Sequence, residues 1–408
     1  MKNEFECKFP LCHHEITYDC LKDSGRNIMK IKYQCCGQCI MDTSDPNIIF
    51  DAKGVCNHCH NYLRVNQVSL LERKSFEAQL DVMRDQDGEY QCVIGVSGGL
   101  DSTFLLLHAV RDLGLKPLAV HVDNGWNNGL ANKNIARLCE ILSIDLHTVV
   151  LDWSEFRLMQ LAILEAGVPD LEAPTDLFIN YTLRSVAKKF KIKYIMSGTN
   201  PQTEAVMGST WSYGQRDPIY LSSLYTRFAG KAPRKLPFKN WYFSILEQST
   251  GALEIVRPLK FISYSRQEAV NRCTREVEWR EYPRKHGESF ITRFYQNYFL
   301  PVRFGFDKRR AHYSALILNG EITREDALTA LSSDPISGPE VSAEIDYFCR
   351  KLQITRAKFD FFMSKPLKFH TEYSSIKNLF VYRVGKNFKR LLISFPGLYR
   401  RIERLILS

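Results

Sequence analysis

The sequence lacks any long apolar run. No stretch of its 408 residues approaches the roughly 20 consecutive apolar residues that a helix needs to cross a bilayer. Its opening, MKNEFECKFPLCHHE, has no apolar core and no small-residue cleavage site, so it does not resemble a secretory signal. We therefore expect a cytoplasmic protein, in which the 12 cysteines serve as metal ligands or free thiols rather than disulfides.

Most of the chain also lacks a strong excess of positive charge. The formal net charge is +10, and residues 377–408 hold eight lysines and arginines against one glutamate, which leaves +3 for the remainder. We therefore expect no nucleic-acid partner. The basic tail alternates apolar and cationic residues on two short segments. It is a candidate for peripheral contact with an anionic inner membrane, and packing on the protein's own helices is the alternative.

Two common phosphate-binding motifs are absent. The stretch GVSGGLDS at 95–102 is a glycine-rich turn after an apolar run, but it fits neither G-x-x-x-x-G-K-[ST] nor G-x-G-x-x-G. Gly98 and Gly99 allow close backbone approach to an anion, and a following helix would point its free N–H groups at the same place. A carboxylate there suits Mg²⁺. The turn therefore predicts a bound pyrophosphate, with Asp101 as the ligand of Mg²⁺.

Short apolar segments alternate with helix-like segments between about residues 91 and 275. The pattern predicts strands at 92–96, 117–122, 146–151, 193–198 and 253–259, and helices at 101–113, 130–143, 154–166, 175–190 and from 263. Such βαβ units indicate an α/β fold with a doubly wound parallel sheet. Past residue 282 the chain becomes helical and aromatic, with amphipathic helices expected at 322–331 and 341–352.

A cysteine cluster precedes this region. Cys36-x2-Cys39 and Cys56-x2-Cys59 are two knuckles separated by 16 residues, close to the spacing of four-cysteine zinc sites. Each knuckle can present two thiolates to one ion. We favour structural Zn²⁺ in a ribbon, and an iron–sulfur cluster is the alternative.

The domain organisation follows from these features. We expect an irregular N-terminal extension at 1–30, a zinc ribbon at 31–66, a nucleotide-binding domain at 75–280, a helical substrate-binding region at 281–376 and a basic amphipathic tail at 377–408.

The motif S-G-G-x-D-S after a strand resembles the loop of the PP-loop ATP pyrophosphatases, whose fold is adenine nucleotide alpha hydrolase-like. These enzymes adenylate a substrate oxygen and then displace AMP. The resemblance implies ATP as a substrate, with Ser97, Asp101 and Ser102 as catalytic residues. The implied ATP-binding set is Gly95, Ser97, Gly98, Gly99, Asp101 and Ser102 at the phosphates, Val122 and Asp123 at the nucleoside, and Gly198, Thr199 and Asn200 beside the reacting centre.

A longer resemblance covers about residues 33 to 376. The segments CCGQCIMDTSDPNIIFDAKGVCNHC, GVSGGLDST, EWREYPRKHGESFITRFYQNYFLP and FGFDKRRAHYSALILNGEITREDAL are similar to those of N-acetyl sugar amidotransferases. That family acts in bacterial surface-polysaccharide biosynthesis, on lipopolysaccharide O-antigen and pseudaminic-type sugars. It implies that the acetamido oxygen of a nucleotide sugar attacks the α-phosphorus of ATP. Ammonia then replaces AMP and gives an acetamidine.

The source of ammonia is missing from the chain. Met1-Lys2 excludes an amino-terminal catalytic cysteine, and no cysteine sits on a glycine-flanked elbow with a histidine partner. A separate partner must therefore supply ammonia. The family resemblance implies a glutaminase and a cyclase-like subunit similar to imidazole glycerol phosphate synthase.

Two other functions remain open. Enzymes that thiolate tRNA also combine zinc knuckles with this loop, but they would need a second C-x-x-C, and none follows residue 59. A non-catalytic zinc-ribbon module is disfavoured, because every residue of the loop motif is intact.

The residues that would hold the sugar nucleotide are less specific. Cations after residue 282 suit its phosphates, and a solvated basic face is the alternative. His312 could be an acid or base, although a lone histidine is more often structural. Asp176, Glu204 and Trp211 lie in the family-like stretch before the later helices. The complete substrate-binding set is Asp176, Glu204, Lys285, Arg293, Lys308, Arg309 and Arg310.

Overall fold

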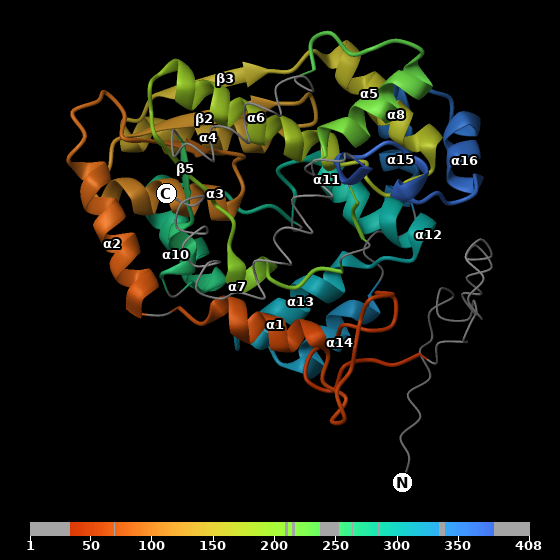
Figure 1. The fold of residues 1–408 in the computed structure, drawn as a ribbon, viewed down its shortest axis with the longest axis horizontal. Helices are drawn as coiled ribbons and strands as arrows, with labels where there is room; N and C mark the ends of the chain where they lie inside the picture. Colours follow the sequence, from red (N-terminus) through yellow and green to blue (C-terminus); the bar gives the residue numbers. More distant parts are fainter. Residues whose placement is uncertain are drawn as a thin grey trace.

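A parallel sheet forms the centre of the N-terminal half (Figure 1). The computed structural model describes residues 33–68, 70–208, 211–213, 217–236, 253–262, 264–283, 286–333 and 339–378. The five strands run parallel in the order β3-β2-β1-β4-β5. They are β1 (Cys92–Gly95), β2 (Pro117–Asp123), β3 (Leu146–Val150), β4 (Tyr194–Met196) and β5 (Glu254–Val256). The predicted α/β fold with a doubly wound sheet is confirmed.

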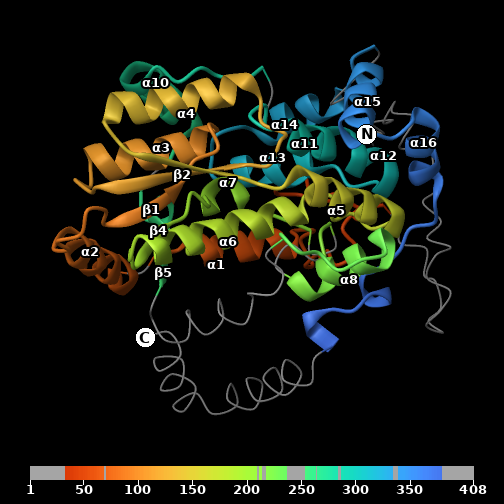
Figure 2. The same ribbon diagram turned by 90° about the horizontal axis from the view of Figure 1, so that it is seen from above.

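Helices cover both faces of the sheet, as Figure 2 shows from above. On one face lie α3 (Leu100–Arg111) and α4 (Gly129–Leu142), with α10 (Arg266–Val277) packed on both. On the other face lies α6 (Ala173–Lys189). Strand β1 alternates between the two cores: Cys92 and Ile94 join the α3 side, and Val93 joins the α6 side. Burial on both faces explains why β1 reads as an apolar run, whereas β3, at the edge of the sheet, alternates exposed and half-buried residues.

The remaining helices surround this unit. They are α1 (Asn57–Asn66), α2 (Leu70–Arg84), α5 (Trp153–Ala166), α7 (Pro201–Glu204), α8 (Pro218–Ala229), α11 (Phe290–Phe294), α12 (Leu300–Phe304), α13 (Lys308–Leu318), α14 (Arg324–Ser332), α15 (Pro339–Leu352) and α16 (Arg356–Ser364). A π-helical turn, Tyr295–Phe299, connects α11 to α12, and short 3₁₀ turns lie at Pro258–Lys260, His370–Glu372 and Ile376–Asn378. Among the described helices, none has both the length and the apolar character that a bilayer span requires.

The largest hydrophobic core lies away from the sheet. It joins the four knuckle cysteines to side chains of α5 and α8 and to the aromatic residues of the C-terminal helices. Phe294, Phe348 and Phe359 form its centre, with ring centroids 4.6–6.2 Å apart. This core therefore draws on three of the expected domains. The boundaries between them stay predictions.

Candidate functional site

The glycine loop connects β1 to α3. Gly98 has a φ of +80°, a left-handed conformation that favours glycine. A Cβ on Gly98 would lie 2.7 Å from the carbonyl oxygen of Ala131 on α4. Both the backbone conformation and the close approach of α4 therefore require glycine here, and the loop is fixed against α4.

Two serine hydroxyls hold the loop in shape. The backbone N–H of Ser97 donates to Ser102 Oγ at 3.2 Å, and Ser102 Oγ donates to the carbonyl oxygen of Gly99 at 3.1 Å. The N–H of Gly99 donates to Ser97 Oγ at 3.2 Å. The first intrahelical bond of α3 comes from Thr103 N–H to the Gly99 carbonyl, so the N–H groups before it have no acceptor within the helix. Their partial positive charge makes this helix end suited to an anion.

Asp101 offers a free carboxylate oxygen at the same helix end. Its Oδ1 is buried and has no hydrogen-bond partner among the described residues. Burial, and next the charge of Asp101, raise the pKa of the neighbouring Tyr264, so that phenol stays neutral. An unpaired carboxylate oxygen is the hard ligand that Mg²⁺ prefers. This oxygen could therefore hold a magnesium ion.

The end of β2 lies beside the loop, because β2 pairs with β1. Val122 pairs with Val149 of β3. Asp123 Oδ1 accepts the N–H of Gly125 at 2.8 Å and so closes the turn that follows the strand. Both predicted nucleoside residues are partly exposed at this edge.

The end of β4 lies on the other side of the loop. A Cβ on Gly198 would lie 3.8 Å from the Cα of Ser102. Thr199 is exposed, and its Oγ1 is 2.9 Å from Ser197 Oγ. Asn200 is fully buried, and its Oδ1 caps α7 by accepting the N–H of Gln202 at 3.1 Å. From β1 the chain adds β2 and β3 on one side of the sheet and then β4 and β5 on the other. Open α/β sheets bind ligands at such a switch point, which here lies between β1 and β4.

A later segment closes around the loop, and its residues Trp279, Tyr282 and Glu288 were assigned no role from the sequence. Trp279 Nε1 and Tyr282 Oη each donate to the Gly98 carbonyl oxygen at 2.9 Å. Glu288 Oε1 would lie 3.1 Å from a Cβ on Gly99. The segment EWREYPRKHGES contributed to the family resemblance and supplied Lys285 to the predicted substrate-binding set. No local pattern in it indicates contact with a loop about 180 residues earlier.

The four knuckle cysteines form one compact, buried cluster. All four Sγ atoms lie within 4.8 Å of one another. Neighbouring pairs are 3.6–3.8 Å apart. Tetrahedral zinc with Zn–S bonds of about 2.3 Å places its sulfurs about 3.8 Å apart. The cluster is therefore compatible with zinc, whereas a multi-iron cluster places its cysteines on separate irons and needs wider spacing.

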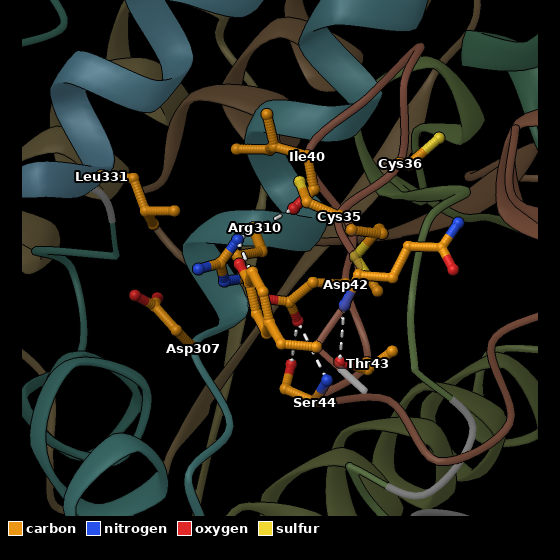
Figure 3. Close-up of polar contacts among 12 residues, drawn as sticks. Cys35, Cys36, Ile40, Asp42, Thr43, Ser44, Asp307, Arg310 and Leu331 are labelled. Atoms are coloured by element: carbon orange, nitrogen blue, oxygen red, sulfur yellow. Dashed lines mark hydrogen bonds and ion pairs between the residues drawn. The ribbon is translucent and has the colours of Figure 1, made fainter. Parts of the chain in front are cut away.

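Helices α13 and α14 hold the first knuckle from outside (Figure 3). Arg310 forms an ion pair of 3.0 Å with Asp42 and donates to the Ile40 carbonyl at 3.1 Å. Ser314 Oγ accepts the N–H of Ile40 at 3.2 Å. Arg324 donates to the carbonyl oxygens of Cys36 and Cys39 at 3.0 and 3.1 Å. The knuckle is thus bound to the helical region through its backbone.

The structure does not gather the predicted phosphate-binding arginines on one open face. Arg293 pairs with Glu344 at 2.7 Å, Arg309 with Asp307 at 2.8 Å, and Arg310 with Asp42. Each guanidinium is thus engaged by a carboxylate of the protein. Lys285 lies outside the described residues.

Lys308 lies against a buried tyrosine. The Lys308 side chain is largely buried, with Nζ 5.0 Å from the ring centroid of Tyr295. Burial, followed by the charges of Asp170, Glu172 and Asp176, raises the pKa of Tyr295 well above its ordinary value. Asp176 thus acts on this tyrosine through its charge.

The other three predicted residues make contacts of their own. Glu204 ends α7 and accepts the N–H of Asn200 at 3.4 Å. Trp211 is fully buried and stacks on Phe306 at a centroid distance of 5.8 Å. The His312 ring lies 5.7 Å from the ring of Tyr313.

Comparison with solved structures finds several α/β enzymes. NMN synthetase from Francisella tularensis has a TM-score of 0.36 at 14% identity and covers 72% of this chain and 97% of that chain. The U34-tRNA thiolase NcsA from Methanococcus maripaludis, solved with its [4Fe-4S] cluster, has a TM-score of 0.31 at 13% identity and covers 71% and 86%. NH₃-dependent NAD synthetase from Campylobacter jejuni has a TM-score of 0.26 at 16% identity and covers 55% and 98%. Because these TM-scores are low, the fold is assigned from the strand order of this chain alone.

Sequence comparison is more specific for the C-terminal region. An uncharacterized protein of Methanocaldococcus jannaschii is 26% identical over 167 residues, which are 40% of this chain and 58% of that relative. The chain thus matches less than two thirds of the relative's length. Residues 288–389 match the family described as "LPS biosynthesis protein WbpG-like, C-terminal domain". Over these residues the chain is similar to the C-terminal domain of the WbpG-like lipopolysaccharide biosynthesis proteins, in agreement with the resemblance found in the sequence.

Proposed function

We propose that the protein is an ATP-dependent amidotransferase of surface-polysaccharide biosynthesis. It adenylates the acetamido oxygen of an N-acetylated nucleotide sugar and replaces AMP with ammonia, which gives an acetamidino sugar. The single observation that carries the proposal is the unpaired Asp101 Oδ1 at the N-terminus of α3, at the switch point of the sheet. The WbpG-like domain that follows supports a sugar substrate from the lipopolysaccharide pathway.

The loop favours release of pyrophosphate rather than transfer of the terminal phosphate. The free N–H groups at the start of α3 and the hydroxyls of Ser97 and Ser102 provide donors for an anion but no lysine for a γ-phosphate. Asp101 would hold Mg²⁺, which neutralises the negative charge that builds up on the departing pyrophosphate. Val122 and Asp123 would lie at the nucleoside, and Gly198, Thr199 and Asn200 beside the reacting centre.

The chemistry has two steps. In the first, the acetamido oxygen bonds to the α-phosphorus, the bond from that phosphorus to the β-bridging oxygen breaks, and pyrophosphate leaves. The amide nitrogen loses its proton, which gives an O-adenylyl imidate. In the second, ammonia bonds to the imidate carbon and AMP leaves with the electrons of the C–O bond. The nitrogen that enters becomes part of the amidine at the oxidation level that it has in ammonia, so no oxidant or reductant is needed.

The helical region would bind the sugar nucleotide. Lys308 supports this, because its largely buried ammonium contacts the ring of Tyr295 and forms no ion pair with a described carboxylate. A buried cation without a direct ion pair is costly, and a substrate phosphate can provide that pair. Asp176, whose charge acts on the same tyrosine, is suited to accept hydrogen bonds from sugar hydroxyls.

Two further parts of the proposal concern partners. A separate glutaminase with a cyclase-like subunit supplies the ammonia. The basic tail brings the otherwise cytoplasmic protein to the inner membrane, and its residues from 379 onward lie outside the described part of the chain. Release of a tail-deleted variant from anionic vesicles that retain the full-length protein would support this membrane contact.

The decisive experiment is an assay of the purified protein with ATP, Mg²⁺, ammonium and a panel of UDP-N-acetyl sugars. The expected result is AMP and pyrophosphate in equal amounts, together with a product that has gained NH in place of oxygen. Formation of ADP and phosphate would contradict the proposal. Formation of AMP only with tRNA and a sulfur donor would instead favour the thiolation function.

A further inference from the structure

The carbonyl oxygen of Gly98 accepts two hydrogen bonds from side chains of a distant segment. Trp279 Nε1 and Tyr282 Oη each donate to it at 2.9 Å. Both side chains are buried, at 3% and 8% exposure, and their rings meet edge to face at 6.0 Å. A carbonyl oxygen has two lone pairs, so these two donors satisfy it fully.

The two donors are themselves fixed. Asn134 on α4 donates to the carbonyl of Arg280 at 2.9 Å and to Tyr282 Oη at 3.2 Å, and it accepts the N–H of Arg280 at 3.1 Å. Burial raises the pKa of Tyr282 to about 12, so the hydroxyl keeps its proton and remains a donor near neutral pH. The segment that begins at Trp279 is therefore anchored on the same helix against which the glycine loop packs.

The geometry of the peptide bond makes this contact important for the loop. In a planar trans peptide the carbonyl of Gly98 and the N–H of Gly99 point in opposite directions. Two successive glycines can rotate the shared peptide at little steric cost. A rotated peptide would break the bond from its N–H to Ser97 Oγ and would turn its carbonyl oxygen toward the side where that hydroxyl and the proposed anion lie, which would replace attraction by repulsion. Fixing the carbonyl therefore also fixes the N–H, which meets Ser97 Oγ.

We propose that Trp279 and Tyr282 are positioning residues of the phosphate loop, which lock the Gly98–Gly99 peptide in the orientation that accepts pyrophosphate. They do not touch substrate and act only through the backbone of the loop. The inference rests on the proposed function in that the anion is the pyrophosphate part of ATP.

The test is calorimetric binding of Mg²⁺-pyrophosphate to the full chain, compared with binding of AMP. Tyr282→Phe removes one donor and leaves the ring. Because one hydrogen bond contributes about 0.5–1.5 kcal/mol, affinity for pyrophosphate should fall about 2- to 10-fold. Affinity for AMP, which lacks the β- and γ-phosphates, should not change. Trp279→Phe should act in the same direction, and in the assay KM for ATP should rise more than kcat falls.

Tyr373→Phe is the matched control. Tyr373 is 7% exposed, and its hydroxyl also donates to a backbone carbonyl, that of Ala166, at 2.9 Å. It should lose similar thermal stability without weakening pyrophosphate binding. Equal pyrophosphate affinity in Tyr282→Phe, Trp279→Phe and wild-type protein would overturn the inference while leaving the proposed function intact. Wild-type protein that binds neither pyrophosphate nor ATP would overturn both.

Discussion

Asp42 beside the first knuckle and Arg310 on α13 form an ion pair of 3.0 Å across 268 residues of sequence. The Asp42 side chain is 3% exposed and that of Arg310 18%, so water screens the pair little. The contact ties the cysteine cluster to the C-terminal helices. Loss of a metal from the cluster should therefore also destabilise the C-terminal helices.

The first prediction concerns the metal. Cys36→Ser and Cys59→Ser should each abolish stoichiometric zinc and expose α13 and α14 to limited proteolysis, because the site folds with its ion. Metal analysis by mass spectrometry and mapping of the cleavage sites would measure both effects. Cys139→Ser is the control, since Cys139 is buried on α4 outside the cluster. Iron in place of zinc in anaerobically prepared protein would show that the ion was assigned wrongly.

The second prediction concerns the ion pair. Asp42→Asn leaves the Arg310 guanidinium without its countercharge and should lower the free energy of unfolding by about 3–5 kcal/mol. Denaturant unfolding followed by aromatic fluorescence would measure this loss. If Asp42→Asn combined with Arg310→Met is no more stable than Asp42→Asn alone, the unpaired charge is not the cause.

The third prediction concerns Asp101. Asp101→Asn should abolish AMP formation, because an amide is a poor ligand for Mg²⁺. Stability should be nearly unchanged, since Oδ1 has no hydrogen-bond partner to lose among the described residues. Initial rates over a range of Mg²⁺ concentrations, together with a thermal melt, would check both points. Wild-type activity of the variant at limiting Mg²⁺ is the result that would refute the assignment.

The fourth prediction concerns the glycine of the loop. Gly98→Ala forces a side chain into the left-handed region and against the Ala131 carbonyl, so it should reduce ATP binding severely. Gly230→Ala is the matched control, because Gly230 has a φ of +69° but open space around its Cβ position. The control should lose only about 1–2 kcal/mol of stability and keep its activity. Similar ATP affinity in both variants would contradict the close packing of the loop on α4.

The fifth prediction concerns the source of the nitrogen that enters the product. Glutamine should not support turnover by the single chain, whereas ammonium should, with a rate that rises with pH as more of it becomes free ammonia. Mass spectrometry of the sugar product after incubation with ¹⁵N-ammonium or amide-¹⁵N-glutamine would distinguish the two. Incorporation from glutamine by the chain alone would mean that it contains its own glutaminase.

Local patterns predicted much of this molecule. The alternation of apolar strands with helices located all five strands to within a few residues, because the buried strands and the edge strand β3 alike are short continuous runs between helices. The two C-x-x-C pairs located the cysteine cluster for a similar reason, since each knuckle is a local turn. In both cases the sequence pattern and the structural feature that it predicts occupy the same few residues.

Contacts between distant segments were beyond the reach of such patterns. The consecutive cations Lys308, Arg309 and Arg310 looked like one basic face, but neighbours on a helix point about 100° apart. In the structure they therefore meet a tyrosine, a cap aspartate and the knuckle aspartate, respectively. Trp279 and Tyr282 were missed because only the folded chain brings them to Gly98.

The bonds from Arg324 to the carbonyls of Cys36 and Cys39 have a consequence for synthesis of the chain. A ribosome adds about 5–20 residues per second, so the first knuckle precedes its arginine by about 15–60 seconds. During that time the thiols have no helical region to cover them, and they are open to oxidation and to other metals. A metal captured early, before α13 and α14 emerge, would protect the thiols during that time.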